Sequence, residues 1–125
     1  MKITGKPMLL IGMSLIIALG VIHLYNAPAE YQEAHYVGLL FMGHCLGSFV
    51  AAAGIYRGSR SWGWGLGFIL SVSACLGYIL SRTVGLPGME PETWLNPTGI
   101  LSLIIEVAFI IQVVYIWTRP AAQKG

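Results

Sequence analysis

Four long apolar stretches constrain the fold of this chain more than any other feature of its sequence. They cover residues 8–25, 34–56, 62–81 and 97–118. Each is about as long as a helix must be to cross a hydrocarbon core about 30 Å thick. Only 10% of the 125 residues are charged, against roughly 25% in ordinary soluble domains. The sequence therefore predicts an all-α, integral membrane four-helix bundle that forms a single domain.

The charged residues divide between the two sides of this predicted bundle. Six of the seven basic residues flank the apolar stretches on one side, while Arg82 and four glutamates fall on the other. Under the positive-inside rule, this asymmetry predicts a multi-pass protein of the cytoplasmic (inner) membrane with both termini inside. No basic run with interleaved aromatic residues indicates nucleic-acid binding. The six basic residues are Lys2, Lys6, Arg57, Arg60, Arg119 and Lys124, and the glutamates are Glu30, Glu33, Glu90 and Glu92.

The first apolar stretch has a competing interpretation as a signal peptide. Lys2 and Lys6 precede it, and Ala27-Pro28-Ala29 fits a cleavage pattern of small residues. The stretch is longer than a usual signal-peptide core. We therefore expect it to be retained as a membrane span.

Small residues recur at four-residue spacing in the second and third stretches. Helices in lipid associate through close packing, which small residues permit. The short connection of residues 57–61 makes the two helices antiparallel neighbours. We therefore expect a tight seam between them, although glycine is also common in membrane helices generally. The spaced residues are Gly43, Gly47 and Ala51 in the second stretch, and Gly63, Gly67 and Ser71 in the third.

Two ionisable residues fall near the predicted midplane of the membrane. Counted from the predicted span ends, His44 lies about 15 Å deep and Glu106 about 14 Å deep, and Ser73 of the third span reaches a similar depth. Because lipid disfavours such groups, we expect His44 and Glu106 to face the interior and to pair directly or through water. Ser48 and Ser102 each lie one turn from one of them and are candidate partners. The alternative is a purely structural hydrogen bond.

A second polar cluster is expected at the outer surface. His23 ends the first predicted span, His35 begins the second, and Glu33 lies between them with Glu30. Imidazole and carboxylate ligands suit a transition metal such as zinc or copper. The spacing matches no metal-binding signature, so solvated interfacial histidines are the alternative.

Haem b is a further use for membrane histidines. Ligation by two histidines needs imidazoles at similar depth on facing helices, and His44 is expected to lie well below His23 and His35. Met13 or Met42 could supply an axial ligand instead. Haem or quinone binding therefore stays open.

The connection of residues 82–96 predicts a compact external cap. Its glycines and prolines prevent helix continuation, and Asn96-Pro97 is typical of a helix start. Arg82 follows the third span, where it can pair with a glutamate, and Trp94 suits the headgroup level. We expect these residues to close the cap over the polar interior.

Several segments together resemble a group of small four-span bacterial membrane proteins. These segments are "VIHLYNAP" at 21–28, "AHYVGLLFMG" at 34–43 and "LSRTVGLPG" at 80–88, together with Glu106 in the last span. The resemblance implies the four-span architecture and directs attention to His23, Arg82 and Glu106. It implies no substrate.

No catalytic motif stands out. "GHCLG" at 43–47 formally matches a nucleophile pattern, but it lies within an apolar helix rather than on a strained turn. We therefore expect a non-enzymatic accessory subunit or small binding module with a polar site at His44, Ser73, Glu106 and Arg82. Its partners would be the lipid bilayer and either further copies or a larger membrane complex. The alternatives are an electron-transfer protein that binds haem b or quinone, and a component of proton-coupled or metal transport.

Overall fold

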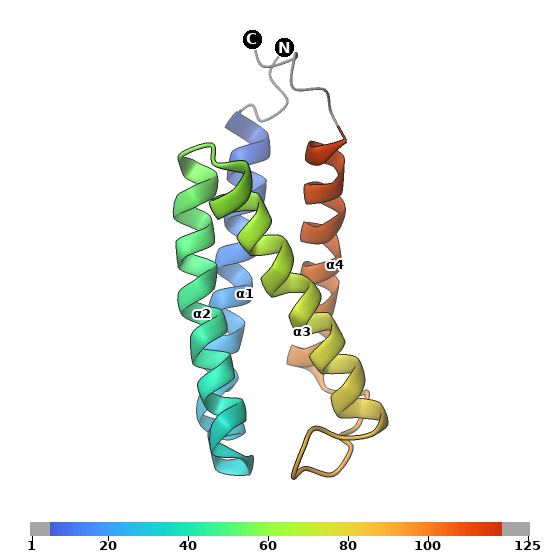
Figure 1. Cartoon of the computed structure of the whole chain (residues 1–125). Coiled ribbons are helices and arrows are strands. Elements are labelled where there is room, and N and C mark those ends of the chain that lie inside the picture. The colour runs from blue at the N-terminus through green and yellow to red at the C-terminus, as the bar shows by residue number, and fades with distance from the viewer. Residues whose placement is uncertain (1–5, 119–125) are drawn as a thin grey trace.

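A computed structural model describes residues 6–118 as a bundle of antiparallel helices. The described residues contain no strand, and four helical segments are long and apolar enough to cross a membrane. This confirms the all-helical class, with four helices long and apolar enough to span a membrane (Figure 1). The elements are α1 (Lys6–Glu33), α2 (His35–Tyr56), a π-helical segment η1 (Arg60–Gly65) that leads into α3 (Leu66–Thr83), and α4 (Pro97–Trp117).

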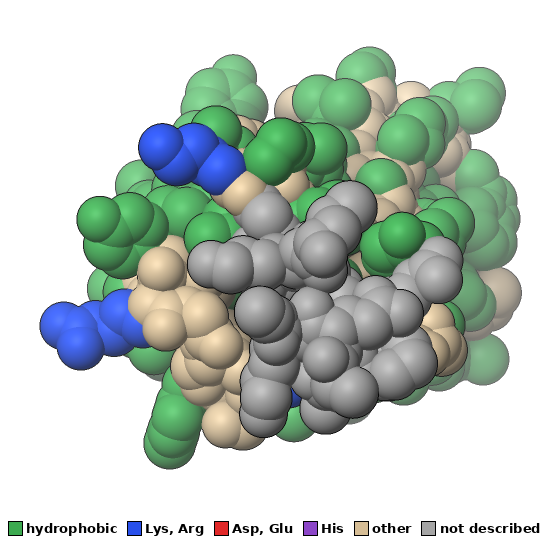
Figure 2. Space-filling view, turned by 90° about the horizontal axis from the view of Figure 1, so that it is seen from above, with side chains coloured by type: hydrophobic (Ala, Val, Ile, Leu, Met, Phe, Trp, Pro, Cys, Tyr) green, Lys and Arg blue, Asp and Glu red, His purple; other side chains and the backbone are tan. Residues whose placement is uncertain are grey.

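The two ends of the bundle carry opposite charge. The start of α1, the end of α4 and the turn of residues 57–59 lie at one end, called here the basic end (Figure 1). Lys6, Arg57 and Arg60 lie there, and Figure 2, which looks onto this end, shows Lys or Arg side chains and no acidic side chain. The opposite end, called here the loop end, carries the loop of residues 84–96 and all four of the glutamates named above. Lys2, Arg119 and Lys124 lie outside the described residues.

Helix α1 is longer than the first apolar stretch. It continues through Pro28 to Glu33, so that only Ala34, in an extended conformation, separates it from α2. Membrane helices tolerate an internal proline when neighbouring groups satisfy the freed backbone, and the residues after Pro28 are mostly good helix formers. A Cβ atom on Gly38 would lie 2.6 Å from the Cα of Tyr31, so glycine lets the two helices meet directly after the turn. The result is a long, tight hairpin of α1 and α2.

The close backbone contact expected between α2 and α3 is confined to the basic end, while farther along α2 Gly47 faces the Leu70 side chain of α3. Gly54 packs on Gly63 so closely that a Cβ atom on Gly54 would lie 2.6 Å from the backbone nitrogen of Gly63. Beyond this contact α3 tilts away from α2 and crosses toward α4 (Figure 1). Gly67 therefore faces the ring of Phe109, whereas a Cβ atom on Gly43 would meet no neighbouring element within 4 Å. Periodicity identified the small residues, but it did not determine which helix they would face.

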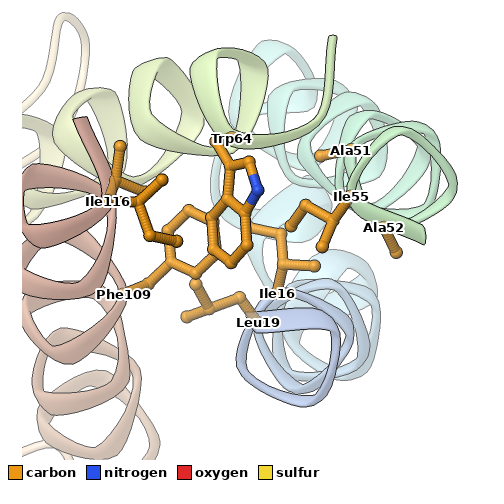
Figure 3. Packing of buried hydrophobic residues seen from close by; sticks show 9 residues of the cluster. Ile16, Leu19, Ala51, Ala52, Ile55, Trp64, Phe109 and Ile116 are labelled. Carbon is orange, nitrogen blue, oxygen red and sulfur yellow. The ribbon is translucent and has the colours of Figure 1, made fainter. Parts of the chain in front are cut away.

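The apolar core lies in the half of the bundle toward the basic end. Trp64 is fully buried, and its indole ring is sandwiched among side chains from α1, α2 and α4 (Figure 3). The rings of Trp64 and Phe109 stack with centroids 5.8 Å apart. This packing holds the helices together in the half of the bundle away from the loop end. The surrounding residues include Ile16, Leu19, Ala51, Ile55, Val113 and Ile116.

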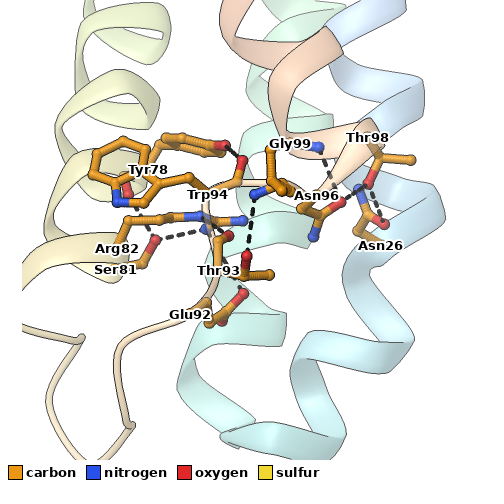
Figure 4. Close-up of polar contacts among 11 residues, drawn as sticks. Asn26, Tyr78, Ser81, Arg82, Glu92, Thr93, Trp94, Asn96, Thr98 and Gly99 are labelled. Atoms are coloured by element: carbon orange, nitrogen blue, oxygen red, sulfur yellow. Dashed lines mark hydrogen bonds and ion pairs between the residues drawn. The ribbon is translucent and has the colours of Figure 1, made fainter.

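Arg82 anchors the loop at the other end of the bundle. Its side chain is only 7% exposed, and its Nε donates to the Thr93 carbonyl at 3.1 Å while Nη1 donates to Ser81 Oγ at 2.7 Å (Figure 4). Nη1 also lies 3.7 Å from a carboxylate oxygen of Glu92, and the guanidinium lies over the ring of Tyr78. The expected pairing of Arg82 with a glutamate is thus confirmed.

The rest of the loop is tied to the start of α4 and to α2. Asn96 caps α4, as expected, by accepting a hydrogen bond from the Gly99 backbone nitrogen at 3.2 Å. The Tyr36 hydroxyl of α2 donates to the Pro87 carbonyl at 2.6 Å, and the Tyr78 hydroxyl donates to the Trp94 carbonyl at 3.1 Å. The loop is therefore held against the helices by specific hydrogen bonds.

Candidate functional site

Three buried ionisable side chains converge between the helices. His23 comes from α1, His44 from α2 and Glu106 from α4, and their exposed fractions are 7%, 9% and 2%. The two imidazole rings stack at 3.8 Å with an angle of 5° between their planes. Nε2 of His23 lies 3.9 Å from Oε2 of Glu106. One ligand atom from each of the three residues lies within 4.8 Å of the other two.

The α1–α2 hairpin explains why the two histidines meet. His23 lies 11 residues before Ala34 and His44 lies 10 residues after it, so both are about 15 Å from the turn. The expected difference in depth between them is therefore corrected. It assumed that the first helix ended near Tyr25, whereas α1 continues to Glu33.

The histidines differ in how their hydrogen-bonding capacity is used. Nδ1 of His23 lies 2.8 Å from the Leu19 carbonyl oxygen. Because a carbonyl only accepts, this nitrogen carries a proton, and the lone pair of the neutral ring is on Nε2. Nδ1 of His44 lies 3.2 Å from Ser48 Oγ, as expected from their spacing. Nε2 of His44 is buried and makes no hydrogen bond of regular geometry within the described part of the chain, and the Leu70 backbone of α3 is close enough to interact with the ring.

Glu106 is held by two donors. The Ser102 hydroxyl donates to Oε2 at 2.9 Å, which confirms the expected contact one turn away. The Cys75 thiol donates to Oε1 at 3.6 Å. Sequence reasoning treated Cys75 as a small apolar residue, and only its position opposite Glu106 on a neighbouring helix gives it this role. Both Cys45 and Cys75 are free thiols.

A cleft of about 460 Å³ extends from these groups toward the loop end. Side chains of all four helices and of the loop line it, and the lining is mostly apolar. The cleft lies where α2 and α3 diverge in Figure 1. Its polar floor is formed by the three converging side chains, and Glu30, Arg82 and Glu92 line it nearer the loop. Pockets of this size and character are typical of small-molecule sites.

The residues expected around the midplane pair are only partly brought together. His44 and Glu106 share one site. The imidazole of His23, however, stacks on that of His44, and it is the His23 ring that lies within ion-pair distance of the Glu106 carboxylate. Ser73 lines the cleft, is exposed, and makes no hydrogen bond to either residue in the described structure. Arg82 lines the same cleft but is bound to the loop.

The expected surface cluster of His23, His35 and Glu33 is not assembled. His35 and Glu33 are exposed, and His35 stacks on Tyr31 with ring centroids 4.3 Å apart. Because α1 remains helical to Glu33, His23 lies about 15 Å below that residue. Among residues 6–118, the group with metal-ligand atoms close together is instead His23, His44 and Glu106.

The stacked rings also bear on haem. Two axial histidines approach an iron from opposite faces of the porphyrin, with the macrocycle between them. The parallel rings of His23 and His44, 3.8 Å apart, leave no room for a macrocycle between them. This arrangement does not fit bis-histidine haem ligation.

Comparisons with protein-family models, curated proteins and solved structures gave no match. The function is therefore argued from the geometry of the cleft and its floor.

Proposed function

We propose that this chain is an integral membrane binding module for a lipophilic molecule with a polar head. The apolar part of the ligand occupies the cleft between α2 and α3, and its head contacts His44 and Glu106 at the floor. Isoprenoid quinones belong to this chemical class, because they carry carbonyl groups on a ring and a long apolar tail. The protein would act as a non-enzymatic module or accessory subunit.

One observation carries the proposal: a mostly apolar cleft ends on a buried, unpartnered hydrogen-bonding atom. Nε2 of His44 has no partner within the described residues, and a buried polar atom left unpaired costs about 1–3 kcal/mol. A carbonyl or hydroxyl group on a ligand would satisfy it. Leu39, Leu40 and Leu70 supply apolar walls for the remainder of the ligand.

We propose that the chain spans the inner membrane in a defined orientation and works in an assembly. The basic end would face the cytoplasm and the loop end the outside of the inner membrane, in accord with the positive-inside rule. Among residues 6–118, thirty large hydrophobic side chains are exposed in the isolated chain, and lipid or further protein subunits would cover them. We propose that the chain acts as a homo-oligomer or as part of a larger membrane complex, which native mass spectrometry of the purified protein would reveal.

Filling the cleft should weaken ligand binding. Gly77 of α3 lines the cleft, and a Cβ atom on it would meet nothing within 4 Å. Gly77→Phe is therefore expected to place a ring in the cleft without disturbing helix contacts. It should weaken binding of a decyl-substituted benzoquinone by about tenfold or more, because the ring takes the space in which one apolar group of the ligand would be buried. Binding would be measured by quenching of tryptophan fluorescence in detergent.

Ala108→Phe is the matched control for this experiment. Ala108 is exposed on α4 and is not part of the cleft lining, so a ring there leaves the cleft unchanged. Equal binding by Gly77→Phe, Ala108→Phe and the unmodified protein would contradict a ligand site in the cleft, as would an unmodified protein that does not bind the quinone.

A further inference from the structure

We infer that His23, His44 and Glu106 form a binding site for one divalent transition-metal ion, of the type that zinc occupies. Two imidazoles and one carboxylate are a ligand set that zinc uses when a further coordination position stays open. The three residues come from α1, α2 and α4, so the ion would join three helices. The ion would use the His44 nitrogen and the Glu106 carboxylate that the head of the ligand proposed above would contact, so the two occupants would compete for these groups.

The spacing of the three side chains suits an ion after a small adjustment. Ligand atoms at 2.0–2.1 Å from a tetrahedral ion lie about 3.3 Å from one another. The separations here are 3.9 Å for His23 Nε2 to Glu106 Oε2 and at most 4.8 Å within the group. The ligand atoms must therefore approach one another by up to about 1.5 Å, and the two stacked rings must turn so that their in-plane lone pairs converge on the ion, which side-chain rotation can provide. A separation of 3.9 Å is too long for a direct hydrogen bond.

The groups around the three residues already have the arrangement of an outer shell. A metal-bound histidine usually donates its other ring N–H to a carbonyl or carboxylate, which fixes the tautomer. His23 makes this bond to the Leu19 carbonyl and leaves Nε2 free toward Glu106. The carboxylate is oriented by the Ser102 hydroxyl and the Cys75 thiol.

The unpartnered nitrogen of His44 is a second and independent indication. Its side chain is more than nine-tenths buried, it lines the cleft, and Nε2 has no partner among the described residues. Coordination would satisfy this atom and would replace the stacked contact between two imidazoles with a shared ion. The cleft would then lie on the open side of the ion.

Zinc titration of the full chain tests the site. The protein would be purified with a tag that contains no histidine, stripped with a chelator, and titrated with Zn²⁺ by calorimetry. We expect one ion per chain, and we expect His23→Gln, His44→Gln and Glu106→Gln each to weaken binding by about 100-fold, at the strong end of the range for altered metal sites. Co²⁺ should give the intense visible bands of a tetrahedral ion in the unmodified protein and not in the three ligand variants.

The chain contains its own control, because His35 is the one remaining histidine and is exposed. His35→Gln should bind zinc as the unmodified protein does. Ser102→Ala removes only the hydroxyl that orients Glu106, so it should fold and bind zinc about tenfold more weakly. The inference is overturned if the stripped protein takes up no zinc, if His35→Gln alone loses it, or if Ser102→Ala and the ligand variants bind as tightly as the unmodified protein.

Discussion

An Arg82→Ala variant is expected to be less stable by about 3 kcal/mol and to release the loop of residues 84–96 from the bundle. The side chain of Arg82 is 7% exposed, and its guanidinium donates to Thr93 and Ser81 and lies 3.7 Å from a carboxylate oxygen of Glu92. Its removal leaves the Thr93 carbonyl and the partly buried carboxylate without this partner. Hydrogen–deuterium exchange should rise across the loop, and the midpoint of denaturant unfolding should fall.

Arg57→Ala is the matched control for Arg82. Arg57 is exposed and lies at the basic end, away from the loop. It should leave both exchange in the loop and the unfolding midpoint close to those of the unmodified protein. If Arg82→Ala and Arg57→Ala have the same exchange in the loop, Arg82 does not anchor it.

A Trp64→Ala variant should have the largest effect among core substitutions, with a loss of about 3 kcal/mol. Trp64 is 0% exposed and stacks on Phe109. Its indole also packs directly on Gly12, where a Cβ atom would lie 2.6 Å from Cζ3. Lipid supplies no hydrophobic drive between helices, so the loss comes from packing contacts around the cavity. Unfolding of the purified protein in mixed micelles would measure it.

Trp62 provides a matched comparison two residues away. Its side chain is 68% exposed, so Trp62→Ala removes the same atoms without a cavity in the core. The unfolding free energy of that variant should stay within about 0.5 kcal/mol of the unmodified value. Equal destabilisation by both substitutions would show that η1 does not place Trp64 in the core of the bundle.

The sequence was sufficient for the features that depend on local chemistry. Apolar length predicted four helices long enough to cross a membrane, and Asn96 before Pro97 predicted the start of α4. The i, i+4 spacing also predicted the contacts from Ser48 to His44 and from Ser102 to Glu106. All of these follow from neighbours along one helix, whose relative positions the helix geometry fixes.

Features that depend on how one helix lies against another were less predictable. The role of His23 followed from the continuation of α1 through Pro28, which brought it to the depth of His44. The contact of Cys75 with Glu106 and the exposure of Ser73 depend on the tilt and rotation of α3. Periodicity within a span does not determine that tilt, because packing against neighbouring helices sets it.

Solid-state NMR of the protein in lipid bilayers would test most directly the convergence of the buried imidazoles and carboxylate. Histidine would be labelled with ¹⁵N and glutamate with ¹³C at the carboxyl carbon, and Glu106→Gln would assign the Glu106 signal. We predict a dipolar coupling between the Glu106 carboxyl carbon and a ring nitrogen of His23, in accord with the 3.9 Å separation of Nε2 and Oε2. It should disappear in His23→Gln and persist in His35→Gln. A Glu106 carboxyl with no coupling to any histidine nitrogen would contradict the site.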